Sequence, residues 1–141
     1  MPLPDPEPGL VISYKFLWSH EADYGQDRGN KIRPALIILV TTENDEKTVW
    51  VSPITHTEPN NEIDGVEIPE RVRDFLGLDN KRQWIIVNEI NSFRWPGIDV
   101  YPLVYSSGTY EYGMIPPKLF DRVKTVQSQN SFNPIQRNEI R

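Results

Sequence analysis

The sequence contains no cysteine, which excludes disulfide cross-links and thiolate metal sites. No apolar run approaches the roughly 20 residues that a membrane-spanning helix needs. The longest run, residues 35–40, has the length of one strand. The chain starts with acidic residues interrupted by proline, unlike the basic and then apolar start of a signal peptide. These absences predict a cytoplasmic protein without a membrane segment.

An excess of positive charge is also missing. The chain carries 15 Lys and Arg against 20 Asp and Glu, which gives a net charge of −5. Nucleic-acid-binding domains draw much of their affinity from basic surfaces, so this balance argues against a general nucleic-acid binder. This balance does not exclude a local basic groove, because net charge does not say where the charges lie. The length of 141 residues is typical of a single globular domain.

Hydrophobic patterning predicts a mainly β domain. The expected strands cover residues 10–18, 35–40, 48–55, 65–68, 83–90 and 100–105. A charged turn at 43–47 makes a hairpin of the second and third strands. A short internal helix is expected from Pro69 to Gly77, and a C-terminal helix opens at Pro116 and ends before Ser128. Because the strands show no regular βαβ alternation, we expect a small antiparallel barrel.

The expected barrel is a single domain over residues 9–127. A proline-rich arm, residues 1–8, precedes it, and a polar C-terminal tail, residues 128–141, follows it. The polar, glycine-bearing segment 19–31 is predicted to be a long loop. Loops of that length in small domains are more often functional than not.

Arg33 is the clearest candidate for a functional residue. It stands where the loop 19–31 meets the buried strand, and Pro34 after it restrains the backbone. A guanidinium in that place presents a planar fork to a phosphate or a carboxylate. The alternative is a structural salt bridge, with Glu21 or Glu89 as the partner.

Thr55 and His56 end a predicted strand, so their polar groups are expected at the rim of the sheet. A hydroxyl and an imidazole can bind phosphate or move a proton, although neighbours in a strand point to opposite faces. An equally good interpretation is that the hydroxyl groups at this strand end only cap a turn. His20 is the other histidine, and two histidines with scattered carboxylates make no recognisable metal site. We therefore expect neither a metal nor a cofactor.

Glu89 is predicted to lie within the otherwise apolar strand 83–90. A carboxylate among apolar neighbours needs a compensating partner, and Arg33 is suited to that role. The other interpretation is that Glu89 performs acid–base chemistry in a cleft.

Three of these segments follow one another in a fixed order. They are Pro8-Gly9-Leu10-Val11-Ile12, then Arg33-Pro34-Ala35-Leu36-Ile37-Ile38, then Val51-Ser52-Pro53-Ile54-Thr55. Together they resemble the N-terminal half of the PemK/Kid and MazF toxins of type II toxin–antitoxin systems. Residues 84–92 are similar to a later strand of that family, which carries an acidic or amide residue near the position of Glu89. Val87 stands where Kid-like members have an arginine.

The resemblance implies an SH3-like barrel of the PemK, MazF and CcdB type, active as a homodimer. It implies metal-free cleavage of single-stranded RNA, in which the 2′-hydroxyl attacks the adjacent phosphate and releases a 5′-hydroxyl. A cognate antitoxin peptide would cover the RNA groove. Carried over to this chain, the catalytic residues are Arg33, Thr55 and Glu89, and the substrate-binding residues are His20, Arg28 and His56.

Two other functions stay open on the sequence. One is a barrel without catalytic activity that serves as a protein- or nucleic-acid-binding module. The other is a toxin of the same fold that targets gyrase through its C-terminal helix. The apolar stripe of that helix favours packing against the core over contact with a target. Its members are Leu119, Phe120, Val123 and Val126.

Overall fold

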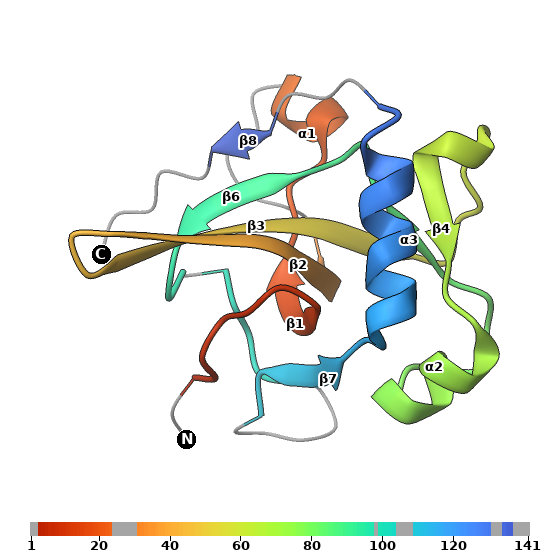
Figure 1. The fold of residues 1–141 in the computed structure, drawn as a ribbon, viewed down its shortest axis with the longest axis horizontal. Helices are drawn as coiled ribbons and strands as arrows, with labels where there is room; N and C mark the ends of the chain where they lie inside the picture. Colours follow the sequence, from red (N-terminus) through yellow and green to blue (C-terminus); the bar gives the residue numbers. More distant parts are fainter. Residues whose placement is uncertain (1–2, 24–30, 98, 104–108, 131–133, 137–141) are drawn as a thin grey trace.

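The computed structural model describes residues 3–23, 31–97, 99–103, 109–130 and 134–136. The strands in these residues are β1 (Leu10–Lys15), β2 (Ile32–Glu43), β3 (Glu46–Thr55), β4 (Gly65–Glu67), β5 (Trp84–Ile86), β6 (Asn91–Arg94), β7 (Glu111–Met114) and β8 (Ile135–Gln136) (Figure 1). The helices are α1 (Ser19–Asp23), α2 (Glu70–Leu76), α3 (Pro117–Gln127) and the 3-10 turn η1 (Glu62–Asp64). The predicted mainly β class, with a short internal helix and a C-terminal helix, is confirmed.

The strands form one sheet in the order β4-β5-β3-β2-β1-β7, and β6 pairs with both β3 and β8. The pairings are antiparallel except that of β6 with β8, which is parallel. No pairing among the described strands joins β4 to β7, so the sheet is not closed there. Of the helices in the described residues, none has the length and apolar character needed to span a membrane.

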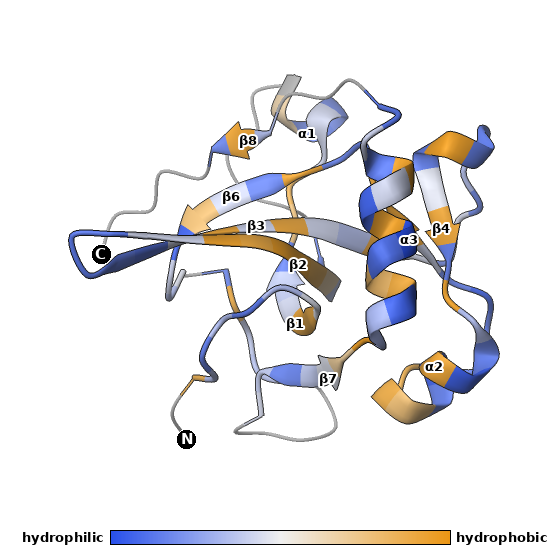
Figure 2. Ribbon diagram, in the orientation of Figure 1, coloured by the Kyte–Doolittle hydropathy of each residue, from blue (hydrophilic) through white to orange (hydrophobic). Residues whose placement is uncertain are grey.

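The β2–β3 hairpin is the longest pairing of the sheet. Its turn consists of Asn44 and Asp45, whose φ angles of 53° and 65° are those of a two-residue hairpin turn with both residues left-handed. Asparagine and aspartate tolerate this conformation better than other non-glycine residues. The charged turn predicted at 43–47 is thereby confirmed. Figure 1 shows the hairpin tip projecting away from the helices, and Figure 2 shows that the tip is hydrophilic.

Both faces of β1, β2 and β3 are covered by apolar side chains, because neighbouring residues of each strand enter two different clusters. Leu36 and Ile38 of β2 join the cluster that α2 and α3 cover with Val72, Leu76, Leu119 and Val123. Ala35 and Ile37 join the second cluster, which contains Tyr14, Phe16 and Phe93. The Tyr14 and Phe93 rings stack with their centroids 4.8 Å apart.

The prediction that residues 35–40 are buried on both faces is correct as far as Ile38 and wrong at Leu39, which is 43% exposed. The register shifts between Ile37 and Leu39, so that Ile38 is an extra residue on β2. Such a bulge bends the strand and interrupts its alternation. Beyond it, Leu39 is exposed while Val40 and its partner Val49 still contact the second cluster.

The strand predicted at 83–90 is interrupted, and this correction matters for the site. β5 ends at Ile86, a turn follows at Val87 and Asn88, and β6 begins at Asn91. β5 and β6 pair with different parts of β3, so the turn is an insertion between two short pairings. Glu89 therefore lies outside any strand. The side chain of Val87 is completely buried in the core.

Other expectations at the ends of the chain also need correction. The strand predicted at 100–105 is reduced to a bridge between Val100 and Tyr14; residues 104–105 lie outside the described part. β7 was not expected, and it pairs with β1. In the segment predicted as a polar tail, Ile135 of β8 donates its backbone N–H to Ile90 at 2.8 Å. Pairing partners from elsewhere in the chain stabilise these short strands, whose local sequence is a weak signal.

Asn91 connects the end of β1 to β6. Its side-chain oxygen accepts a hydrogen bond from the Leu17 backbone N–H at 2.9 Å, and its amide donates to the Leu17 carbonyl at 2.8 Å. Asn91 is completely buried and Leu17 is 3% exposed. The Asn91 amide thus satisfies both backbone groups of Leu17, which lies beyond the end of β1. It thereby connects the segment that leads into α1 to β6.

Replacing Asn91 with alanine is expected to lower the free energy of unfolding by about 2–4 kcal/mol, because two buried backbone groups lose their partner. Urea unfolding followed by tryptophan fluorescence measures this change. Asn60→Ala, at an exposed position, is the matched control and should change stability by less than about 0.5 kcal/mol. Equal effects of the two substitutions would show that the Leu17 connection does not stabilise the fold.

Candidate functional site

One end of the sheet opens into a cleft with a volume of about 660 Å³. The segment around α1, the start of β2, the end of β3 and the turn after β5 all contribute to it. Four of the six predicted site residues line this cleft, namely His20, Arg33, Thr55 and Glu89. Of the other two, His56 is absent from the lining, and Arg28 lies outside the described residues.

The pairing of β2 with β3 brings Arg33 and Thr55 together. Ala35 is opposite Pro53, and the same register continued by two residues sets Arg33 opposite Thr55. Side chains opposite each other in an antiparallel pair lie on the same face of the sheet. Both residues line the cleft accordingly, although 21 positions separate them in the hairpin.

The Arg33 guanidinium lies over the Trp18 ring, 5.1 Å from its centroid. Such cation–π contact holds the guanidinium plane in a fixed orientation. Burial lowers the pKa of Arg33, and the negative charge of Glu21 acts in the opposite direction. Of the two salt-bridge partners considered from the sequence, Glu21 is thus the one whose charge acts on Arg33. The Arg33 Nε atom is buried and has no hydrogen-bond partner among the described residues.

Glu21 is a buried carboxylate of α1. The sequence predicted a loop over residues 19–31, so α1 is a correction to that prediction. Glu21 accepts the Trp18 backbone N–H at 2.9 Å, and the Ala22 N–H donates to the Trp18 carbonyl at 3.0 Å. A glutamate in the first turn that returns to the first backbone N–H is half of a capping box. The acidic residue near the start of Ser19–Asp23 is the sequence signal that could have revealed α1.

Glu89 approaches the cleft from the turn after β5 and is tied to α1. Its two oxygens accept the Ser19 backbone N–H at 2.8 Å and the Ser19 hydroxyl at 2.5 Å. The pairing of Glu89 with Arg33 considered from the sequence is not seen among the ion pairs of the described residues, and Ser19 supplies the hydrogen bonds of this carboxylate instead. A carboxylate has about four acceptor sites, so it can accept a further proton or donor from the cleft.

Thr55 is half-buried, and its hydroxyl oxygen accepts the Thr57 backbone N–H at 3.2 Å. The hydroxyl proton stays available for donation, because accepting a hydrogen bond does not use it. The turn-capping role considered from the sequence and a role in binding are thus compatible in this residue.

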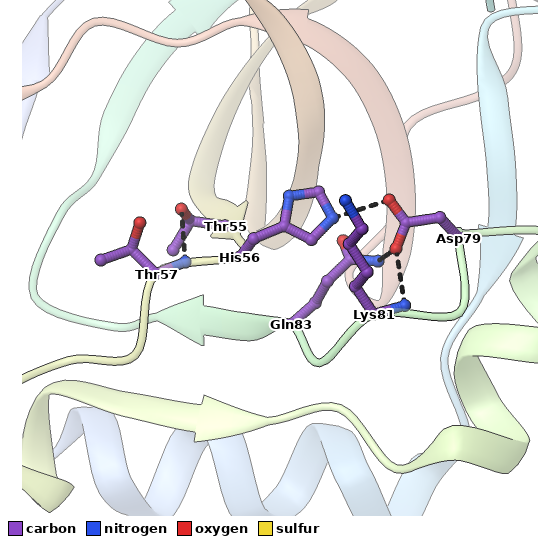
Figure 3. A network of polar contacts seen from close by, with 6 residues as sticks. All are labelled: Thr55, His56, Thr57, Asp79, Lys81 and Gln83. Carbon is purple, nitrogen blue, oxygen red and sulfur yellow. Dashed lines mark hydrogen bonds and ion pairs between the residues drawn. The ribbon is translucent and has the colours of Figure 1, made fainter.

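His56 points away from the cleft toward the loop before β5 (Figure 3). Its Nε2 atom lies 2.7 Å from an oxygen of Asp79, whose other oxygen accepts the Lys81 backbone N–H and the Gln83 side-chain amide. Strand alternation explains why His56 and Thr55 separate, as the sequence predicted. His56 therefore connects the end of β3 to this loop and does not line the cleft with the other predicted site residues.

Charges of both signs line the cleft. Lys31 and Arg33 supply positive charge, and the carboxylates among the lining residues are Glu21, Glu58, Asp64 and Glu89. The His20 ring stacks on Trp18 at a centroid distance of 6.3 Å. A cation, a free hydroxyl proton, a carboxylate and an imidazole in one hollow are the groups of acid–base and phosphate chemistry. Among the described residues, no three His, Asp or Glu side chains are grouped to hold a metal ion.

The His56–Asp79 contact predicts a loss of stability in acid. Burial raises the pKa of Asp79, but the hydrogen bonds from Lys81 and His56 outweigh it, so that the pKa lies below its ordinary value of 3.8. A carboxylate with a lowered pKa stabilises the fold above its unfolded pKa, and this contribution disappears as pH falls through the folded value. The stability difference between wild type and Asp79→Asn should therefore close as pH drops below 3.8.

Urea unfolding between about pH 5 and pH 2.5 measures this difference. Asp121→Asn, at an exposed position of α3, is the control and should show no comparable closing. A difference that is constant over this range would contradict a titration of Asp79 coupled to folding.

Comparison with known proteins gives no family assignment. Neither the models of protein families nor the curated proteins contain a match to this chain. The chemistry assigned to the cleft therefore rests on its own side chains.

Proposed function

We propose that the cleft is the active site of a toxin-like endoribonuclease that cuts single-stranded RNA without a metal ion, on an SH3-like barrel that acts as a homodimer. One observation carries the proposal. Arg33 and Thr55 open into the same cleft as Glu89 and His20, although these residues come from four separate segments. The resemblance of residues 8–93 to the PemK/Kid and MazF toxins adds to it.

Arg33 is the group suited to the phosphate. Its guanidinium is oriented by Trp18 and offers planar N–H donors to two phosphate oxygens. Because Nε is buried, the terminal amino groups are the part of the side chain that meets a ligand. Negative charge grows on the phosphate oxygens as the 2′-hydroxyl attacks, and a fixed cation stabilises that charge more than it stabilises the bound substrate.

Thr55 and Glu89 complete the reaction. The Thr55 hydroxyl donates its free proton to a phosphate oxygen beside Arg33. Glu89 accepts the proton of the ribose 2′-hydroxyl, the freed oxygen attacks phosphorus, and the bond to the 5′-oxygen breaks. The products are a cyclic phosphate and a 5′-hydroxyl, and His20 is suited to supply the proton that the departing 5′-oxygen needs.

The acidic surroundings favour a flexible single strand over a duplex. A duplex presents two rows of phosphates to a surface with few cations, whereas one strand can place a single phosphate against Arg33 and turn the others away. In this proposal a cognate antitoxin peptide inhibits the enzyme by covering the cleft.

Arg33→Ala is expected to lower kcat/KM on a single-stranded RNA oligonucleotide about 100- to 1,000-fold, through loss of the transition-state cation. Arg33→Lys keeps the positive charge beside Glu21 but lacks the planar fork, so it should recover folding without full activity. Arg94→Ala is the matched control, since Arg94 is exposed and pairs with Glu46 away from the cleft. Cleavage is measured in EDTA by gel, with 5′-hydroxyl ends as the product signature.

Expression in growing cells separates the proposal from its two alternatives. Growth arrest with transcripts cut to 5′-hydroxyl ends, abolished by Arg33→Ala, is the expected result. Growth arrest with intact RNA would refute the nuclease and favour the gyrase-targeting toxin. Unchanged growth and intact RNA with a folded wild-type protein would also refute it and favour a binding module.

A further inference from the structure

A second hollow is lined by residues of α2 and α3 and of the segments before them, and it shares no lining residue with the cleft. This α2–α3 groove has a volume of about 810 Å³. Its apolar floor is made of the exposed Pro69 and Pro116 and of the edges of Val72 and Leu119, which are 7% exposed and otherwise belong to the core.

Phe75 is exposed on α2 next to the lining residue Asp74, although it does not itself line the groove. It is 73% exposed, the largest exposed fraction among the big apolar side chains of the described residues. Phe75 follows Val72 by three positions, so the two side chains are neighbours on the helix. The hydrophobic colour of this end of α2 is visible in Figure 2. An exposed aromatic ring beside an apolar groove is typical of a protein–protein contact surface.

The charged residues on the α3 side of the groove are basic. Lys118 and Arg122 of α3 are four positions apart and line the groove together. On the α2 side, Arg71 is accompanied by Glu70 and Asp74. None of these five residues takes part in an ion pair with another described residue. The α3 side of the groove therefore carries two cations, whereas the α2 side carries one cation and two carboxylates.

We propose that the α2–α3 groove binds an acidic amphipathic peptide segment of a partner protein. Its apolar side chains lie on the floor and against Phe75, and its carboxylates face Lys118 and Arg122, as in helix-in-groove recognition. A nucleic acid has no apolar face to lay on this floor, whereas an amphipathic peptide does and can turn its carboxylates toward α3 and away from Glu70 and Asp74. The groove is separate from the cleft, so this inference does not depend on the proposed nuclease activity.

Two fluorescein-labelled probe peptides of about four helical turns test the charge complementarity. Both carry leucine on one face; the remaining positions are glutamate in one peptide and lysine in the other. Fluorescence anisotropy at low salt should show tighter binding of the glutamate peptide. Arg122→Glu should raise the Kd of the glutamate peptide about fivefold or more and lower the Kd of the lysine peptide. Lys124→Glu makes the same change in net charge outside the groove lining and should have less effect on either.

Phe75→Ser should weaken the binding of both peptides. Circular dichroism of this variant checks that its helix content is unchanged. Arg33→Ala should bind both as the wild type does, even if it abolishes RNA cleavage. The proposal is overturned if neither peptide binds saturably, or if Arg122→Glu and Lys124→Glu have equal effects. It is also overturned if sedimentation shows self-association that Phe75→Ser abolishes, because a second copy would then occupy the groove.

Discussion

The register of β2 against β3 is the constraint on which the rest of the structure depends. The left-handed turn at Asn44 and Asp45 sets which residues pair, and the pairing continues to the far end of both strands. Because each face of these strands enters a different apolar cluster, a slip by one residue would exchange the two faces and disrupt both clusters. The same register sets Arg33 opposite Thr55. Core packing of the hairpin therefore determines where Arg33 and Thr55 lie in the cleft, while Trp18 and Ser19 orient Arg33 and Glu89.

Burial on both faces also explains where the molecule can offer binding surfaces. α2 and α3 cover one face of the sheet, while the aromatic cluster around Tyr14 and Phe93 occupies the other. Neither face of the central strands is free for a ligand, so the hollows occur where elements end. The cleft lies at the ends of β1, β2 and β3, and the α2–α3 groove lies at the first turns of its two helices. The two sites are consequently built by different segments and can be altered independently by substitution.

The features predicted correctly from the sequence are those whose signal is local. The alternation of Ile12, Tyr14 and Phe16, the polar turn at 43–47 and the proline-led helices all describe short stretches, and each occurs as expected. The sequence also identified Arg33 and Thr55 as residues of the cleft, because a strand end is visible in the hydrophobic pattern. The errors concern contacts that depend on distant partners. Glu89 was placed in a strand because residues 84–87 and 90 are apolar, but β3 pairs separately with β5 and β6, and Glu89 lies between these two strands and accepts hydrogen bonds from Ser19.

Arg33 shows why the structural and functional interpretations of a single residue need not exclude each other. Glu21 is buried beside the cleft, and a buried carboxylate without a nearby cation would be costly. The guanidinium that compensates this charge also packs on Trp18, and Arg33 lines the cleft. In the proposed reaction, folding thus positions the cation in advance, and binding of the RNA does not have to order a flexible arginine side chain. This preorganisation is what an anion-binding site needs, and here it follows from the requirement to compensate a buried charge.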